Sequence, residues 1–204
     1  MSSRSVAVLV PVKAFDQAKV RLAGALDASA RASLAKSMAA AVVRAAAPLA
    51  VSIVCDDDAV ASWAGSLGAS VIWCPGRGLN GAVADGVAHL GSIGIKRVIV
   101  AHADLPHALD LTWVADFDGI TLVPDRHDDG TNVISCETDC GFTFAYGAGS
   151  FARHSAEGER LGLPLRVVRE PRLGWDIDLP ADLATPSWLD HSDGTGDVRR
   201  PGQT

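Results

Sequence analysis

The sequence has few aromatic residues, few cysteines and no long apolar segment, and each shortage excludes a class of protein. Its 204 residues are 5% aromatic and include four cysteines, and no apolar segment approaches the ~18 residues that span a bilayer. The cysteines form no CxxC pair, so we expect buried thiols rather than a zinc site or disulfides. The first apolar segment, Val6–Val12, is too short for a signal peptide and has no small-residue cleavage site after it. We therefore expect a cytoplasmic protein without a membrane partner.

Positive charge is also scarce. The formal net charge is −6, and the four lysines and fourteen arginines form no basic tract. Long nucleic acids are bound through many contacts of lysine and arginine with phosphates, so we exclude them as partners. A single nucleotide is still possible, because it needs only a few local cations.

Several catalytic motifs are missing. The sequence contains no GxxxxGK[ST] segment, no GxGxxG after the first expected strand, no GxSxG and no HExxH. These absences argue against a P-loop, a dinucleotide-binding motif, a serine-hydrolase elbow and a zinc protease. We interpret His102 and His154 as structural or rim residues rather than as catalytic bases.

What the sequence does contain is a regular alternation of short β-branched segments and longer alanine-rich segments with helical periodicity. The expected strands are Val6–Val12, Val51–Cys55, Ala69–Trp73, Arg97–Ala101, Gly119–Pro124, Val133–Cys136, Phe142–Tyr146 and Leu165–Arg169. The expected helices run from Asp27 or Ser29 through Pro48, around Trp63 after a cap at Asp57 or Asp58, and over Leu79–Leu90, Asp110–Ala115, Ser150–Leu161 and a short stretch after Pro180. This order predicts a single α/β domain, residues 1–186, with a mixed, mostly parallel sheet between helices. Residues 187–204 are polar and lack periodicity, so we expect a flexible C-terminal tail.

Ligands of open α/β sheets bind outside the carboxyl ends of the strands, so the residues there are the first candidates for a site. The first strand leads into Pro11 and Lys13, and Lys19 and Arg21 follow within the same loop. Three cations within nine residues suit a polyphosphate.

A glycine-containing loop follows the third strand. Gly78 and Gly81 would let the backbone approach a base or a phosphate, and Asn80 has a donor and an acceptor for a base edge. By itself this loop is also compatible with an ordinary turn.

Three aspartates are candidate metal ligands. Asp104 follows a central apolar strand, where a carboxylate is costly unless it meets a cation or water, although it could instead cap a helix before Pro106. In an extended segment, Asp176 and Asp178 would lie on the same side and could converge on one ion. Carboxylates of this kind, completed by substrate phosphates, suit Mg²⁺.

Two further segments carry small polar groups. Thr131 and Asn132 begin a strand, and Gly147, Gly149 and Ser150 lie at the start of a helix. A helix N-terminus with free N–H groups favours a carboxylate or a phosphate. The alternative is an ordinary serine-capped helix.

Six segments in order resemble one family. They are PVK…AKVRLA (Pro11–Ala23), GLN (Gly78–Asn80), ADLP (Ala103–Pro106), PDRHDDGTN (Pro124–Asn132), FAYGAGSFARH (Phe144–His154) and DIDLPADL (Asp176–Leu183). Together they resemble the phosphoenolpyruvate or 2-phospho-L-lactate guanylyltransferases of coenzyme F-420 biosynthesis, over about residues 6–185. Ala148 stands where the family more often has proline, and Tyr146 where it has phenylalanine; neither change removes an expected ligand.

The resemblance implies a GT-A-like, three-layer nucleotidyltransferase fold and a reaction between GTP and a phosphorylated three-carbon acid. It assigns Mg²⁺ to Asp104, Asp176 and Asp178, and the acid's carboxylate and phosphate to Thr131, Gly147 and Ser150. Lys13, Lys19 and Arg21 match the loop that binds the triphosphate. The attacking phosphate oxygen is already anionic at neutral pH, so the absence of a base motif is expected.

We expect phosphoenolpyruvate as the acid, with 2-phospho-L-lactate and 3-phospho-D-glycerate as alternatives. A molybdopterin-type or sugar-phosphate nucleotidyltransferase should carry a GGxSxRMG-like loop after the first strand, which this chain lacks. A non-catalytic nucleotide-binding relative should have lost a metal carboxylate, yet all three aspartates are present. The resemblance also implies transfer of the product to a downstream deazaflavin transferase, and it leaves a homodimer open.

Overall fold

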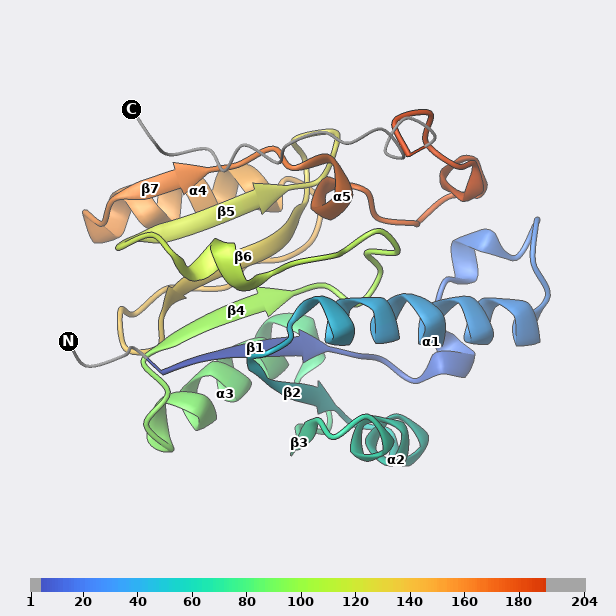
Figure 1. Ribbon diagram of the computed structural model, residues 1–204, viewed down its shortest axis with the longest axis horizontal. Coiled ribbons are helices and arrows are strands. Elements are labelled where there is room, and N and C mark those ends of the chain that lie inside the picture. The colour runs from blue at the N-terminus through green and yellow to red at the C-terminus, as the bar shows by residue number, and fades with distance from the viewer. Residues whose placement is uncertain (1–4, 190–204) are drawn as a thin grey trace.

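The computed structural model describes residues 5–189, which form a seven-stranded sheet between two layers of helices (Figure 1). The strands are β1 (Val6–Pro11), β2 (Ala50–Cys55), β3 (Ser70–Trp73), β4 (Arg97–Ala101), β5 (Ile120–Pro124), β6 (Thr131–Glu137) and β7 (Leu165–Val167). The α-helices are α1 (Ala28–Ala45), α2 (Asp58–Ser66), α3 (Gly78–Ser92), α4 (Ser150–Leu161) and α5 (Pro171–Gly174). Short 3-10 helices are η1 (Phe15–Gln17), η2 (Val20–Leu22), η3 (Thr112–Ala115) and η4 (Pro180–Leu183).

The sheet is mixed and mostly parallel, as the sequence predicted. Its strand order is β3-β2-β1-β4-β6-β5-β7, and only β6 runs antiparallel to its neighbours β4 and β5. The amino end of β6 therefore lies at the same edge as the carboxyl ends of β1, β4 and β5. The cations after β1, Asp104 after β4 and Thr131 at the start of β6 all belong to this edge.

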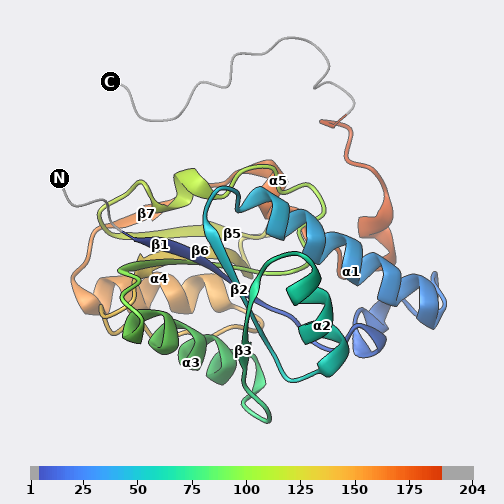
Figure 2. The same cartoon turned by 60° about the horizontal axis from the view of Figure 1, so that its bottom comes forward.

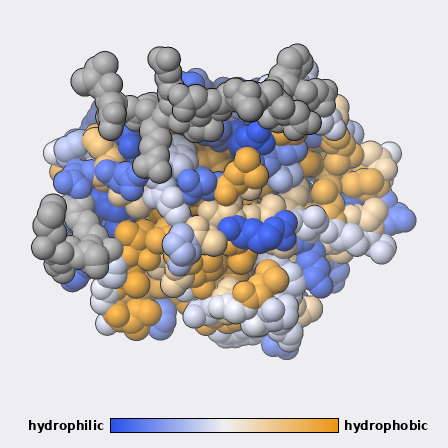
Figure 3. All heavy atoms as spheres, viewed as in Figure 1, coloured by the Kyte–Doolittle hydropathy of each residue, from blue (hydrophilic) through white to orange (hydrophobic). Residues whose placement is uncertain are grey.

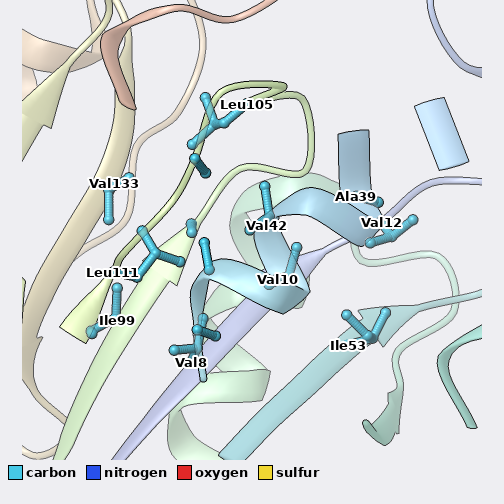
Figure 4. Close-up of a cluster of buried hydrophobic side chains, with 14 of the residues drawn as sticks. Val8, Val10, Val12, Ala39, Val42, Ile53, Ile99, Leu105, Leu111 and Val133 are labelled. Carbon is cyan, nitrogen blue, oxygen red and sulfur yellow. The ribbon is translucent and has the colours of Figure 1, made fainter. Parts of the chain in front are cut away.

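Alternate residues of each strand build two hydrophobic cores, one on each face of the sheet. Val8 and Val10 of β1 face α1 and α2 (Figure 4), whereas Ala7 and Leu9 belong to the core beneath α3. Figure 2 shows the resulting layers, with α1 and α2 on one face of the sheet and α3 and α4 on the other. Both faces of the central strands are covered, which accounts for their uninterrupted apolar sequences.

The structure shows which residue caps each of the first two helices, where the sequence had left two candidates for each. The carboxylate of Asp27 accepts a hydrogen bond from the Ala30 N–H at 2.7 Å, and that of Asp57 accepts one from the Val60 N–H at 2.9 Å. Each bond satisfies an N–H group that has no partner within the helix. The first helix ends at Ala45 rather than at Pro48.

One expected strand is wrong. Phe142–Tyr146 is irregular, because β6 already pairs with β4 on one side and β5 on the other and leaves this segment no edge. Side chains satisfy its backbone instead: Glu157, His154 and Asn80 accept from the N–H groups of residues 143, 145 and 146. The apolar alternation arises because Phe142, Phe144 and Tyr146 belong to the core beneath α3.

The chain makes side-chain contacts beyond residue 186, where the sequence predicted the end of the domain. The ring of Trp188 lies 5.6 Å from that of His107 and 6.4 Å from that of Trp175, between centroids. The Leu189 N–H also donates to the carbonyl oxygen of Pro186 at 3.0 Å, and the rest of the expected tail, 190–204, lies outside the described residues. The sequence also missed α5, η1 and η2, whereas the strand expected over Leu165–Arg169 is found as the shorter β7.

The surface that carries α1 has hydrophobic groups interspersed with hydrophilic ones (Figure 3). The large exposed apolar side chains, among them Val20, Ile93 and Leu109, come from separate segments of the chain. Within residues 5–189, every helix is too short or too polar to cross a bilayer. All four cysteines are free thiols, two of them buried and two partly exposed.

Candidate active site

Three carboxylates meet at the edge of the sheet where β1 and β4 end. Asp104 follows β4, and the Ile177 N–H donates to the carbonyl oxygen of Asp104 at 3.3 Å, which brings the segment after α5 alongside. As a result, one carboxylate oxygen from each of Asp104, Asp176 and Asp178 lies within 4.8 Å of the others. The structure thus brings together the three aspartates that the sequence singled out, and Asp104 does not cap a helix.

Lys19 neutralises two of these carboxylates. Its Nζ lies 2.6 Å from Oδ2 of Asp104 and 2.9 Å from Oδ1 of Asp178, and Nη1 of Arg21 lies 3.6 Å from Oδ2 of Asp178. Burial alone would raise the pKa of Asp104, but the ammonium of Lys19, the nearby His102 and hydrogen bonds to the carboxylate together lower it. Burial likewise opposes the charge of Lys19, and its attraction to Asp104 and Asp178 raises its pKa nonetheless.

The donor set fits a hard divalent cation. Oδ1 of Asp104 is buried and has no hydrogen-bond partner within the described chain. Burial, and then repulsion from Asp104, raise the pKa of Asp176, so negative charge at this point is only partly compensated by the protein. Three carboxylates with an unpartnered oxygen suit the all-oxygen coordination of Mg²⁺.

Arg126 and Asp182 hold the segment that carries Asp176 and Asp178. Asp182 accepts from the N–H groups of Asp178 at 2.9 Å and Leu179 at 2.6 Å, and it also pairs with Arg126. Arg126 donates to the Asp176 carbonyl oxygen at 3.0 Å. Neither role was predicted from the sequence. The only available signal was an aspartate two residues after the proline that starts η4, a position typical of capping.

Asn132 also supports this segment. Its side-chain amide donates to the carbonyl oxygen of Leu173 at 2.9 Å. A hydrogen bond from Asn132 also lowers the pKa of Asp176 and so opposes the increase that burial causes. Asn132 is buried. Through these contacts Asn132 supports the segment that carries Asp176, and its expected contact with the substrate stays a prediction.

A pocket of about 630 Å³ opens beside the three carboxylates. Pro11, Lys13, Lys19 and Arg21, all expected to bind a nucleotide, line it. From the carboxylate side it is lined by Asp104 and Asp178, and from the loop before α4 by Gly147. The pocket is therefore cationic along one wall and anionic at its end, an arrangement that suits a polyphosphate bound with a metal ion.

The glycine loop at the start of α3 contributes to the pocket only through Leu79. Gly78 adopts a φ of 61°, which favours glycine. The carboxamide oxygen of Asn80 accepts the Tyr146 N–H at 2.7 Å, so only its NH₂ group is left for a ligand. Neither Gly78 nor Gly81 lines the pocket.

The loop before α4 has fewer free N–H groups than the sequence suggested. The Gly149 N–H donates to the carboxylate of Asp129, and the Phe151 N–H donates to the carbonyl oxygen of Asp129. The Ser150 N–H donates to the carbonyl oxygen of Gly147. Three donors are left: within the described chain, the N–H groups of Gly147 and Ala148 and the Ser150 hydroxyl have no hydrogen-bond partner. The positive φ angles of 116° at Gly147 and 70° at Gly149 shape the loop that presents them.

Thr131 begins β6 beside this loop. It is buried, and its hydroxyl oxygen lies 3.0 Å from Nδ1 of His154. Thr131, Gly149 and Ser150 do not line the 630 Å³ pocket; Gly147 connects the two regions. The site therefore has two parts, a cationic pocket and an adjoining group of small polar donors, with the three aspartates at the first.

The chain matches known proteins over most of its length. A family model described as "Guanylyl transferase CofC like" matches residues 6–195. A protein named phosphoenolpyruvate guanylyltransferase from Sphaerobacter thermophilus is 38% identical over 184 residues, covering 86% of this chain and 89% of that protein. One of the same name from Roseiflexus castenholzii is 33% identical over 199 residues, covering 96% and 89%.

The fold also matches solved structures. A nucleotidyl transferase from Methanothermobacter superposes with a TM-score of 0.61 and 13% identity, covering 94% of this chain and 97% of that one. At this identity the similarity concerns the fold, and it agrees with the nucleotidyltransferase-like fold that the sequence predicted.

Proposed function

Because the chain belongs to the family of CofC-like guanylyl transferases, we propose that it transfers GMP from GTP to the phosphate of phosphoenolpyruvate. The observation that carries the proposal is the convergence of Asp104, Asp176 and Asp178 at one end of a pocket whose other wall holds Lys13, Lys19 and Arg21. Relatives that carry the name phosphoenolpyruvate guanylyltransferase support the choice of acid.

In the proposed reaction, a phosphate oxygen of phosphoenolpyruvate forms a bond to the α-phosphorus of GTP. The bond from that phosphorus to the bridging oxygen of the β-phosphate breaks, and diphosphate leaves with the bonding electrons. The products are enolpyruvyl-diphosphoguanosine and diphosphate. The attacking oxygen is already anionic, so alignment and charge neutralisation are the tasks left to the protein.

The chain's own groups suit these tasks. Lys13, Lys19 and Arg21 would bind the triphosphate and compensate the charge that develops on the leaving diphosphate. The Ser150 hydroxyl, the Thr131 hydroxyl and the backbone at Gly147 would orient the acid. Mg²⁺ held by Asp104, Asp176 and Asp178 would supply further charge neutralisation on the phosphates when bound. Arg126, Asp182 and Asn132 hold Asp176 and Asp178 in place for it.

The product would be an activated ester from which a downstream transferase of coenzyme F-420 biosynthesis takes the three-carbon group. Attack on the diphosphate linkage would release GMP and pass the acid on as its phosphate ester.

To test the proposal, the rate of diphosphate release from GTP is measured in the presence of Mg²⁺. The acid is phosphoenolpyruvate, 2-phospho-L-lactate or 3-phospho-D-glycerate, each in a separate assay. ATP and CTP replace GTP as nucleotide controls, and pyrophosphatase pulls the reaction forward. Release with GTP and phosphoenolpyruvate alone supports the proposal, and release with a different acid corrects the substrate. If folded protein binds GTP but releases no diphosphate with any of the three acids, the proposed reaction is wrong.

A further inference from the structure

His154 makes hydrogen bonds through both ring nitrogens while fully buried. Its Nε2 accepts from the backbone N–H of Ala145 at 2.9 Å, and its Nδ1 lies 3.0 Å from Oγ1 of Thr131. One imidazole ring thus joins the loop before α4 to the first residue of β6. Neither contact is used by the reaction chemistry described above.

These two bonds determine the tautomer of the ring. A backbone N–H can only donate, so Nε2 carries no proton, and in the neutral ring the proton is on Nδ1. Burial, and then the neighbouring guanidinium of Arg153 and the ring of His102, lower the pKa of His154 to about 4, against the opposite effect of Glu157. The ring is therefore neutral at physiological pH, and Nδ1–H donates to Oγ1 of Thr131.

The tautomer in turn determines the direction of the Thr131 hydroxyl. Because Oγ1 accepts from His154, its own proton cannot point back to Nδ1. No other residue among those described accepts a hydrogen bond from Thr131. The Thr131 hydroxyl is left with an unused donor at the sheet edge where Asp104 also lies.

We propose that His154 is a positioning residue that makes the Thr131 hydroxyl a donor toward the carboxylate of the acid substrate. The same ring holds the loop through Ala145, whose carbonyl oxygen Arg153 binds at 2.9 Å. This inference rests on the proposed function for the identity of the ligand. The tautomer of His154 does not depend on it.

The first test is therefore independent of activity. Nitrogen-15 NMR of the histidine rings distinguishes the two neutral tautomers, and loss of one signal in the His154→Gln variant assigns it. We expect the Nδ1–H tautomer for His154 at neutral pH. Observation of the Nε2–H tautomer, or of a doubly protonated ring, would overturn the inference whether or not the protein is active.

The second test separates positioning from general support of the fold. In the His154→Asn variant the amide NH₂ can replace Nδ1–H toward Thr131, whereas in His154→Gln the amide oxygen can replace only Nε2 toward Ala145. We expect His154→Gln to raise KM for phosphoenolpyruvate about tenfold, the effect of one lost hydrogen bond, with KM for GTP changed less than about twofold. We expect His154→Asn to restore most of the affinity for the acid. His89→Gln, on the exposed face of α3, is the matched control.

A double-mutant cycle then tests whether His154 acts through Thr131. In a Thr131→Val background, His154→Gln should change KM for the acid no further. Equal effects on GTP and acid, or full additivity with Thr131→Val, would contradict the proposal. If wild-type protein uses another acid from the panel, the same cycle applies to that acid, while the proposed choice of phosphoenolpyruvate fails separately.

Discussion

Nζ of Lys19 lies 2.6 Å from Oδ2 of Asp104, although the two residues are 85 positions apart in the chain. The pair joins the loop after β1 to the end of β4, and it keeps both groups charged at neutral pH. Lys19 reaches this position with a left-handed backbone, φ 53°, which is uncommon for a residue other than glycine. Backbone strain of this kind often accompanies functional sites.

Replacing Asp104 should remove activity and leave the fold intact. Asp104→Asn keeps the size of the side chain and removes the charge that would hold a metal ion, so we expect diphosphate release to fall at least about a hundredfold. Diphosphate release is measured at saturating Mg²⁺, and circular dichroism checks the fold. Asp139→Asn, in an exposed turn, is the control. Turnover close to that of the wild type would remove Asp104 from the metal site.

Replacing Lys19 should weaken the use of GTP more than the use of the acid. Lys19→Met keeps the apolar stem and removes the ammonium, and loss of one transition-state cation costs about a hundredfold in kcat/KM for GTP. Steady-state kinetics with each substrate varied in turn measures this split. Lys36→Met, an exposed lysine of α1, should be indistinguishable from wild type. A Lys19 variant as active as the Lys36 variant would limit Lys19 to a structural role.

Replacing Ser150 should affect the acid selectively. The Ser150 hydroxyl makes no hydrogen bond within the described chain, so Ser150→Ala should unfold at about the same denaturant concentration as wild type. We expect KM for phosphoenolpyruvate to rise about tenfold, with KM for GTP nearly unchanged. Comparable increases for both substrates, or none, would place the acid elsewhere.

The free energy of unfolding should decrease at acidic pH partly because of His154. Its pKa is about 4 in the folded protein, against an ordinary value of 6.5, so the unfolded chain takes up a proton first as the pH falls. The stabilising contribution is complete above about pH 6.5 and is lost as the pH falls toward 4, amounting to about 2 kcal/mol between pH 7.5 and pH 5.

Urea unfolding at those two pH values measures this contribution. His154→Gln should reduce the pH dependence by about that amount, whereas His89→Gln should leave it unchanged. An unchanged dependence in the His154 variant would show that the ring is charged in the folded state or does not carry this contribution.

Apart from the strand wrongly expected over Phe142–Tyr146 and the missed short helices α5, η1 and η2, the sequence by itself determined the order of strands and helices. Each of these elements depends on local periodicity and on caps such as Asp27 and Asp57. Alternation in an extended segment placed Asp176 and Asp178 on one side, and the resemblance to the guanylyltransferase family implied that they would meet Asp104. Charge and spacing near the first strand likewise indicated the cationic wall at Lys13 and Lys19. These features depend on short stretches of chain and on the general geometry of parallel sheets.

Only the tertiary structure decided which partners these groups have. Phe142–Tyr146 has the alternation of a strand, yet the preceding strand β6 is already paired on both sides, and side chains from α3 and α4 satisfy the backbone of this segment instead. The support of Asp178 by Asp182, and the two bonds that set the tautomer of His154, join segments whose approach local patterns do not encode. The spacing of apolar residues along a helix or strand predicts which of its faces is buried. The direction of each hydrogen bond depends on the side chains that packing brings from elsewhere in the chain.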